Sequence, residues 1–445
     1  MSARGGVERA LPAGAAGLAP GSWTERHGLP VGAALLAAGG PAVDPGRFEA
    51  LLLDPVEVLA DPARPFDALE ALAGRARGGA TAGPCPRVVC LLGYDLGRTV
   101  EDIPAHARVE GHLPDCWAAR YTAAWIHDRA TGRGWISADD AGAADRLAAR
   151  LAAGGPTPPA LRALAPAVAG ASPAWHRAAV ERIQAHITAG DVYQINVALR
   201  FEAPVAPGDP AALFARLRAR SPVPFAACVR PTATTAVLSL SPERFLAWDA
   251  DGRVETRPIK GTRPRGATDA ADAALAAELL ASEKDRAEHV MIVDLQRNDL
   301  GRVCAPGTVR VPRLLALESY ATVHHLVSTV EGTLEPPHGL AALLRATFPG
   351  GSITGAPRLR AMQLIEAIEP VRRGIYCGSI GHVDARGGGD LNIAIRTAWV
   401  AGDRIYYSAG GGIVADSDAA AEHAEVLVKA QAFLDGLLHG GSSEE

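Results

Sequence analysis

Apolar residues recur at helical spacing in several stretches of the chain that follow residue 174. From Trp175 to Ala189 they follow one helix face, and Gly190 stands where a helix would stop. The same pattern predicts helices over residues 282–300, 355–368 and 417–438. The face of the first of these helices carries Ala178, Val180, Ile183 and Ile187.

Segments with strand-like composition alternate with these helices. One strand is expected to start at Val192, and others cover residues 236–240, 375–383, 391–400 and 404–408. Short loops with Gly or Asp join the last three, which is typical of antiparallel neighbours. Strands mixed with helices predict an α/β (α+β) enzyme with antiparallel sheet rather than a doubly wound nucleotide-binding fold.

A stretch rich in Pro, Ala and Gly, residues 152–173, is the clearest change in composition. We interpret it as a linker or loop between an N-terminal region, 30–151, and a catalytic region, 174–438. Residues 1–29 lack the apolar run of a secretory signal and are expected to form a ragged N-terminus. Residues 439–445 are expected to form a tail.

Composition narrows the range of partners. The 445 residues are 48% hydrophobic, and 49 acidic and 44 basic residues are interspersed to give a net charge of -5. This pattern argues against nucleic acid or a membrane as a partner, and no apolar run is long enough to cross a bilayer. The six cysteines lack zinc-type pairs, so reduced thiols in a cytoplasmic protein are expected.

Two predicted helices each carry a pair of acids three residues apart, Asp285 with Glu288 and Glu422 with Glu425. This spacing places both carboxylates on one helix face. A single pair is typical of a solvated surface, and Glu425 could form an ordinary ion pair with Lys429. Two pairs that faced each other across a cleft would offer an all-oxygen site suited to Mg²⁺.

Three loops rich in glycine or hydroxyl groups are expected around these helices, at residues 239–243, 348–358 and 408–413. Glycine lets the main chain approach a ligand and offer N–H groups to anions. Turns alone could explain any one segment. Together with Arg396, expected in a strand, and Lys429 on the last helix, they suggest a pocket for a small dianionic substrate.

These residues carry a resemblance to a known family. From about Trp175 to Leu437 the chain resembles the chorismate-utilising enzymes, whose motifs occur here in the family's order. The N-terminal segments 47–51 and 93–98 are similar to the first component of aminodeoxychorismate synthases. The resemblance implies a two-lobed chorismate-utilising enzyme fold, with largely antiparallel sheets packed face to face and helices outside. The matching segments are 193–196, 241–245, 258–262, 294–301 and 323–326.

The family also includes anthranilate, isochorismate and salicylate synthases, and three features distinguish among these branches. Gln194 stands where water-using members carry a lysine, which indicates a member that uses ammonia. Lys260 stands where anthranilate synthases have alanine, which indicates amination at the 4-position. The Leu-Leu-Glu-Ser motif for inhibitory tryptophan is replaced by residues 35–38, Leu-Leu-Ala-Ala, so tryptophan feedback is not expected. Anthranilate synthase component I and a non-catalytic chorismate-binding scaffold remain the alternatives.

The resemblance implies roles for individual residues. Lys260 would be the covalent nucleophile, Glu243 the general acid, and His325 a neighbour of the reacting ring. Without their motifs these residues would be interpreted as a surface lysine, a carboxylate paired to Arg244 and a core histidine. The substrate-binding residues implied are Thr262, Thr354, Tyr376, Arg396, Gly410, Gly411, Gly412 and Lys429.

The resemblance also implies a cofactor and a partner. Magnesium would be bound by Glu288 and Glu425 directly, with Glu422 and Asp285 beside them, although Asp285 departs from the family's commoner Glu. No cysteine lies in the Gly-x-Cys-x-Gly elbow of a glutaminase. A separate glutamine amidotransferase subunit is therefore expected to supply the ammonia.

Overall fold

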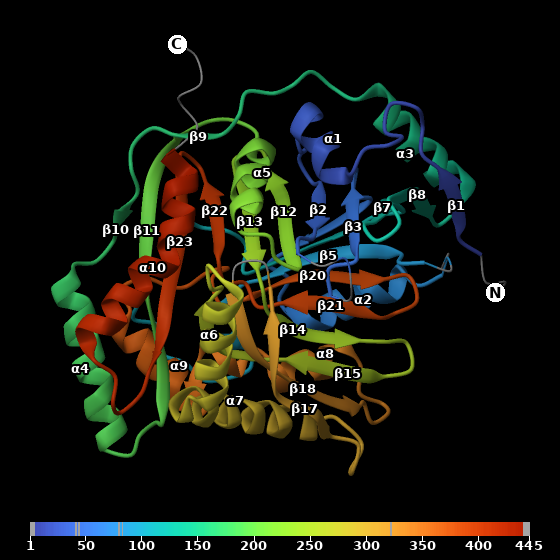
Figure 1. The fold of residues 1–445 in the computed structure, drawn as a ribbon. Coiled ribbons are helices and arrows are strands. Elements are labelled where there is room, and N and C mark those ends of the chain that lie inside the picture. The colour runs from blue at the N-terminus through green and yellow to red at the C-terminus, as the bar shows by residue number, and fades with distance from the viewer. Residues whose placement is uncertain are drawn as a thin grey trace.

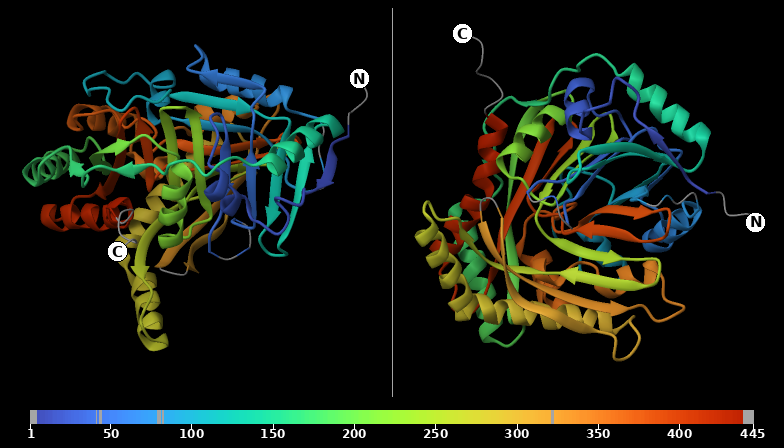
Figure 2. Two further views of the ribbon diagram at one scale, coloured as in Figure 1. Left: turned by 90° about the horizontal axis from the view of Figure 1, so that it is seen from above. Right: turned by 45° about the vertical axis from the view of Figure 1, so that its right-hand side comes forward.

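Antiparallel strands form two large sheets in the computed structural model, which describes residues 5–40, 42, 45–78, 81, 83–320 and 323–438. The sheets face each other, and most helices lie outside them (Figure 1; Figure 2, right). This arrangement confirms the predicted fold class.

The larger sheet has 13 strands among the described residues. Its order is β1-β8-β7-β3-β2-β12-β13-β22-β23-β11-β10, and β19 and β9 also pair with β11. The strands are β1 (Val7–Ala10), β2 (Ala34–Ala37), β3 (Phe48–Leu52), β7 (Ala123–Asp128), β8 (Arg133–Ala138), β9 (Arg162–Ala163), β10 (Val168–Ala169), β11 (Gln194–Ala206), β12 (Phe225–Thr232), β13 (Thr235–Ser241), β19 (Gly355–Ala356), β22 (Thr397–Ala401) and β23 (Arg404–Ile413).

The smaller sheet has 10 strands in the part of the chain described. Its order is β16-β18-β15-β14-β21-β20-β5-β6-β4, with β17 also beside β18. The strands are β4 (Glu57–Ala60), β5 (Pro86–Leu92), β6 (Cys116–Arg120), β14 (Arg244–Trp248), β15 (Arg253–Arg257), β16 (Ile259–Pro264), β17 (Arg310–Ser319), β18 (Val323–Thr333), β20 (Ser379–Asp384) and β21 (Gly389–Asn392).

Helices cover the outer faces and carry part of the site. One of them, α6, stands out from the body with only Leu279 buried (Figure 2, left). The helices are α1 (Pro20–His27), α2 (Pro65–Arg75), η1 (Tyr94–Thr99), α3 (Ala141–Ala153), α4 (Pro173–Thr188), α5 (Pro210–Arg220), α6 (Asp269–Ala281), α7 (Glu283–Gly301), α8 (Leu340–Thr347), η2 (Gly351–Ile353), α9 (Arg358–Ile368) and α10 (Ala419–Leu438).

Apolar side chains form three buried clusters that correspond to these layers. The largest contains residues of both sheets, such as Ala198 and Leu246, and continues under α2 and α8. A second lies between the larger sheet and the outer helices, where Phe433 of α10 stacks on Tyr407 at 4.2 Å between ring centroids. A third joins α4 and α9 to β11. Each of the three clusters joins segments that are distant in the sequence, so long-range packing holds the sheets and their helices together.

The predicted helices at 175–189, 282–300 and 417–438 are confirmed as α4, α7 and α10. Hydroxyl caps fix two of the starts, because Ser172 accepts from the Trp175 N–H and Ser282 from the Asp285 N–H. The helix expected from Gly355 begins only at Arg358. Residues 355 and 356 form β19 instead, and Pro357 precedes the first turn.

Two of the expected strands were too long. The segment 391–400 is not one strand, because β21 and β22 belong to different sheets and the chain crosses between them. Arg396 lies in this crossing, with a φ of 49°, and not in a strand. The segment 375–383 becomes a strand only at Ser379, since Cys377 has a φ of 64°, which a strand does not tolerate.

The expected ragged N-terminus was wrong for the described residues. Within segment 1–29, β1 pairs with β8, and α1 buries Trp23 completely. The stretch 152–173 is a long connection that carries only the short β9 and β10. It does not separate two folding units, since β2 pairs with β12 and β5 with β20. The predicted tail, 439–445, lies outside the described residues.

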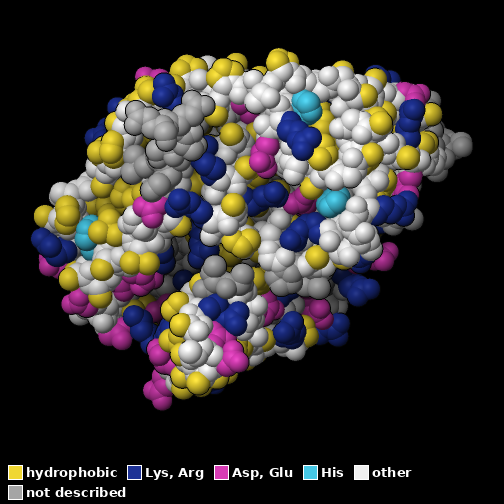
Figure 3. All heavy atoms as spheres, turned by 45° about the horizontal axis from the view of Figure 1, so that its top comes forward, with side chains coloured by type: hydrophobic (Ala, Val, Ile, Leu, Met, Phe, Trp, Pro, Cys, Tyr) yellow, Lys and Arg dark blue, Asp and Glu magenta, His cyan; other side chains and the backbone are white. Residues whose placement is uncertain are grey.

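The surface and the cysteines agree with the composition. Basic and acidic side chains alternate over the face in Figure 3 without a broad patch of one sign. All six cysteines are buried and free. None of the helices described is both long and apolar enough to span a bilayer.

Candidate active site

Lys260 lies on β16, where this strand passes between β18 and α7. Thr262 faces His325 of β18 across the pairing, and a register shift separates Thr262 from Lys260. Gly261, between them, has a φ of 75°. A Cβ there would lie 2.9 Å from Leu279 Cδ1 and 3.1 Å from Asp285 Cβ, so glycine allows the strand to approach α6 and α7 closely.

The electrostatic surroundings of Lys260 are mixed. Burial lowers the pKa of its amine, and the nearby carboxylates of Glu288, Glu243 and Glu425 oppose this effect. Lys429 lowers the pKa further by repulsion. The result is an amine that loses its proton more easily than an exposed lysine and lies within electrostatic range of the Glu243 carboxyl group.

The arginines around Lys260 are paired with carboxylates. Arg257 binds Glu318, Arg265 binds Asp272 at 2.7 Å, and Arg263 binds Glu278 at 2.8 Å and Asp285 at 3.2 Å. Lys260 itself is half-buried and lies in strand β16 rather than in a loop, so the interpretation as a surface lysine in a basic loop is wrong.

Glu243 occupies the short connection between β13 and β14 and is 4% exposed. Its Oε1 accepts a hydrogen bond from the Ser352 hydroxyl at 2.7 Å. Burial raises the pKa of this carboxyl to about 7, although Ser352 and Lys260 favour the charged form. The alternative pairing with Arg244 is wrong, because Arg244 binds Asp390 and Glu255.

His325 is 3% exposed, and its Nδ1 lies 2.9 Å from the Thr262 hydroxyl oxygen. Burial, together with nearby Arg396, lowers the pKa of the imidazole to about 4. The ring is therefore neutral at pH 7. It can donate or accept a hydrogen bond but does not add a charge beside Lys260.

The two acid pairs lie on α7 and α10 as predicted, and their partners differ. Glu422 accepts a hydrogen bond from Ser417 at 2.7 Å, Glu425 pairs with Lys429 at 2.7 Å, and Asp285 pairs with Arg263. Glu288 is half-buried and forms no hydrogen bond or ion pair with another described residue. Burial raises its pKa, and Asp285 and Glu422 add to this rise, while Lys260 opposes it.

The oxygen atoms of these carboxylates are suitable ligands for a hard cation, but they do not form a complete coordination shell by themselves. Repulsion from Glu422 reaches Glu288, so acids of both helices share one region. Glu288 also offers oxygens without a protein partner. Yet no three His, Cys, Asp or Glu side chains in the described part of the chain are close enough to hold a metal ion by themselves. A magnesium ion here would need water or substrate oxygens as further ligands.

The glycines at 410–412 lie in a strand, not in the expected loop. They belong to β23 and pair with residues 196–198 of β11. A Cβ on Gly411 would lie 3.1 Å from Glu422 Oε2, and one on Gly412 would lie 2.0 Å from Gln194 Nε2. Because glycine has no Cβ, the strand leaves space at these positions next to Glu422 and Gln194. Lys429 closes this region by donating to the Gly410 carbonyl at 3.0 Å.

The remaining predicted residues have different surroundings. Thr354 is buried, and its hydroxyl donates to the carbonyls of Gly350 and Gly351, which fixes the preceding loop. Arg396 lies within electrostatic range of His325. Tyr376 is 3% exposed, lies 5.8 Å from the Arg373 guanidinium and lines a separate cavity. Their contacts with a substrate remain predictions.

Sequence reasoning missed three neighbours of the site. Ser352 binds the general-acid candidate. His289 is fully buried, with Nε2 2.7 Å from the Ser328 hydroxyl, and it contacts the Lys260 backbone. The positive charge of Lys284 favours the charged form of both Glu288 and Glu425 and so acts to lower their pKa values. Only Lys284 had a sequence signal, because it lies four residues before Glu288 on the same helix.

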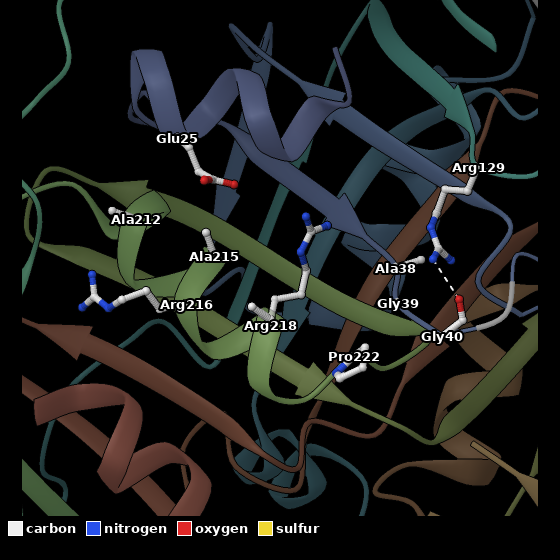
Figure 4. A pocket seen from close by; sticks show the side chains of 11 residues that line it. Glu25, Ala38, Gly39, Gly40, Arg129, Ala212, Ala215, Arg216, Arg218 and Pro222 are labelled. Atoms are coloured by element: carbon white, nitrogen blue, oxygen red, sulfur yellow. Dashed lines mark hydrogen bonds between the residues drawn. The ribbon is translucent and has the colours of Figure 1, made fainter. Parts of the chain in front are cut away.

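Another cavity, of about 700 Å³, lies elsewhere in the molecule and is larger than the cavity that Tyr376 lines. α5 and the region around Gly39 form its walls, and no predicted site residue lines it (Figure 4). Two of its arginines are already bound, Arg218 to Glu49 at 2.8 Å and Arg129 to the Gly40 carbonyl at 2.9 Å. Because none of the predicted site residues lines this cavity and two of its arginines already have partners, we do not assign it as the catalytic site.

Comparison with known proteins identifies the family. The model of the chorismate binding enzyme family matches residues 47–435, which is most of the chain. The chain belongs to the chorismate binding enzyme family.

Individual relatives agree with this assignment. The chain is 46% identical over 348 residues to aminodeoxychorismate synthase component 1 of Klebsiella aerogenes, which covers 78% of this chain and 76% of the relative. It is 42% identical over 369 residues to anthranilate synthase component 1 of Streptomyces coelicolor, covering 78% and 72%. Anthranilate synthase component I from Streptococcus pneumoniae TIGR4 superposes with a TM-score of 0.76 at 29% identity, covering 88% and 93%. The predictions of this family and of an enzyme are confirmed.

Proposed function

We propose that this chorismate binding enzyme replaces the 4-hydroxyl of chorismate with an amine from ammonia, giving 4-amino-4-deoxychorismate. The observation that carries the proposal is the juxtaposition of Lys260, whose pKa is lowered, with Glu243, whose pKa is raised to about 7. A neutral amine and a protonated carboxyl are what a covalent displacement at neutral pH requires.

The proposed reaction has two allylic steps. The neutral amine of Lys260 forms a bond to C2, both ring double bonds shift along the ring, and the C4–O bond breaks while Glu243 protonates the departing oxygen to give water. Ammonia then forms a bond to C4, both double bonds shift back, and the C2–N bond of the ammonium adduct breaks to release neutral Lys260. Glu243 regains its proton from the new ammonium group, so atoms and charges balance.

Other side chains have positioning roles in this proposal. Neutral His325, held by Thr262, borders the ring without a charge that would repel ammonia or Lys260. Arg396, Lys429 and the main-chain groups of residues 410–412 would bind carboxylate oxygens. Thr354 would shape the pocket wall, and Tyr376 would lie between this pocket and the separate cavity that it lines. Gln194, beside Gly412, offers no base to activate water, which favours ammonia as the nucleophile.

Magnesium is proposed as the cofactor. It would be bound by Glu288 and Glu425, with Asp285 and Glu422 beside them, and would neutralise a substrate carboxylate and orient it. The unpartnered carboxylate of Glu288 supports this assignment.

A second component is proposed as the source of ammonia. The relative from Klebsiella aerogenes is named component 1, which implies another component in that enzyme. Glutamine-dependent turnover by this chain should therefore require an added glutamine amidotransferase, whereas free ammonia should support turnover alone. Glutamine use by the highly purified single chain would contradict this proposal.

Anthranilate synthase activity is the second candidate, since a relative of that name is 42% identical. Product analysis after incubation with chorismate, magnesium and an ammonium salt separates the possibilities. The proposal predicts 4-amino-4-deoxychorismate. Anthranilate would support the second candidate, and no product would support a non-catalytic chorismate binder.

A further inference from the structure

A polar cavity of about 180 Å³ lies beside β11, and none of the proposed catalytic residues lines it. Its walls come from β11, β23, the segment before α4 and the loops around Glu110 and Pro370. Tyr376 forms part of it, while Lys260, Glu243 and the four acids of the candidate metal site do not.

Arg200 is the exceptional residue in this wall. It is 8% exposed, and its guanidinium lies 4.9 Å from the Trp399 ring centroid. Its Nη groups donate only to main-chain carbonyls, those of Glu110 at 3.4 Å and of Arg372. Its Nε is buried without a hydrogen-bond partner, and no carboxylate of the described residues forms an ion pair with it.

The other charges of the wall cancel in pairs. Glu369 binds Arg373 at 2.7 Å, and Glu110 binds Arg108 at 3.0 Å. Glu202 pairs with Arg404 at 3.4 Å. Arg200 is therefore the one arginine of the lining that forms no ion pair with a described carboxylate. Burial lowers its pKa, while the carboxylates of Glu369 and Glu110 oppose this effect from a distance, and a bound anion in direct contact would stabilise the charge further.

The loops around the cavity are tied together without a ligand. Arg108 N–H donates to the Pro370 carbonyl at 3.1 Å, and Arg372 N–H donates to the Arg108 carbonyl at 2.9 Å. Trp399 Nε1 donates to the Gly111 carbonyl at 2.9 Å. The cavity is thus preformed, which lowers the entropic cost of binding.

The size and lining select the class of ligand. The volume corresponds to about six water molecules and lies below the usual range for drug-sized ligands, roughly 300–1,000 Å³. Trp175, Val371 and Pro370 provide apolar wall. We propose that this cavity binds a small monocarboxylate with a flat apolar body, a benzoate-like anion whose carboxylate pairs with Arg200.

The test is a titration of the full chain with 4-fluorobenzoate, followed by ¹⁹F NMR with and without saturating chorismate and magnesium. We expect one binding site that chorismate does not displace. Arg200→Gln should weaken binding about tenfold or more, because a charge-assisted contact is lost. Ala171→Phe, which fills the cavity from the loop before α4 and leaves Arg200 in place, should abolish binding.

The matched control is Arg177→Gln, which removes a positive charge from the exposed face of α4 without altering the lining and should leave the affinity unchanged. Thermal unfolding verifies that each variant is folded. If Arg200→Gln does not fold, Ala171→Phe decides the outcome. Absence of binding at millimolar ligand, displacement by chorismate, or undiminished binding by Ala171→Phe would overturn the proposal. Equal binding of acetate would overturn the requirement for an apolar body.

Discussion

The hydroxyl of Ser352 donates to Oε1 of Glu243 at 2.7 Å, in a position where both side chains are buried. This bond favours the charged carboxylate, yet burial outweighs it and leaves the pKa of Glu243 at about 7. The acid is therefore partly protonated at neutral pH, and Ser352 limits how far its pKa rises.

Removal of this bond should change the pH profile of the chemical step. A general acid acts in its protonated form, so adduct formation with chorismate should slow as the pH rises through about 7. Ser352→Ala should raise the pKa of Glu243 and move this alkaline limb to higher pH. Stopped-flow measurement without ammonia tests this. Ser239→Ala, a buried hydroxyl bonded to Thr397 at 2.8 Å, is the control and should leave the limb in place.

The same carboxyl should couple folding stability to pH. Its pKa in the folded chain, about 7, lies above the ordinary value of 4.5, so its contribution to stability is fully present below 4.5 and is lost as the pH rises toward 7. Glu243→Gln cannot ionise. Its free energy of unfolding relative to wild type should therefore increase between pH 5 and 7, by roughly 1–3 kcal/mol. Urea unfolding at both pH values measures this, and a constant difference would contradict the raised pKa.

The assignment of Glu288 as a magnesium ligand can be tested with two variants of acidic residues on α7. Glu288→Gln should raise the magnesium concentration needed for half-maximal turnover by about tenfold or more, because a charged oxygen ligand is lost. Asp294→Asn, an exposed acid of α7 paired with Arg297 at 2.8 Å, should leave the titration unchanged. Equal magnesium titrations for the wild type and Glu288→Gln would show that the magnesium site does not include Glu288.

A buried ion pair should govern the stability of the site's scaffold. Arg358 at the start of α9 binds Asp299 near the end of α7 at 2.6 Å, with the side chains 9% and 3% exposed. Arg358→Met should cost about 3–5 kcal/mol in urea unfolding, because the buried carboxylate of Asp299 then keeps only the longer contact with the more exposed Arg302, at 3.3 Å. Arg297→Met, which breaks an exposed pair, should cost about 1 kcal/mol or less. Similar losses for both variants would contradict this account.

Local pattern and motif order predicted much of the helical framework. The spacing of apolar residues located α4, α7 and α10, and the three-residue spacing placed both acid pairs on those helices. Lys260 and Glu243 could be singled out because their motifs surround them. Their altered pKa values could not, since these depend on burial by segments that are distant in the chain.

The errors have a common physical origin in tertiary pairing. Residues 410–412 suggested a loop because glycine is flexible, but pairing with β11 holds them in a strand. Arg396 suggested a strand from its apolar neighbours, yet the chain turns there to change sheets. The first 29 residues appeared irregular in composition, but pairing with β8 orders part of them. Nothing near Arg200 in the sequence indicates that its charge is left unpaired.

The covalent role of Lys260 is the central claim and has a direct measurement. The chain is incubated with chorismate and magnesium without ammonia, and intact-protein mass spectrometry follows its mass. We expect a gain equal to chorismate less one water, located on the peptide that contains Lys260. Lys284→Ala, which removes another lysine of the pocket, should retain this adduct, and Lys260→Ala should lose it. No adduct in the wild type, together with formation of 4-amino-4-deoxychorismate by Lys260→Ala at the wild-type rate, would contradict the account.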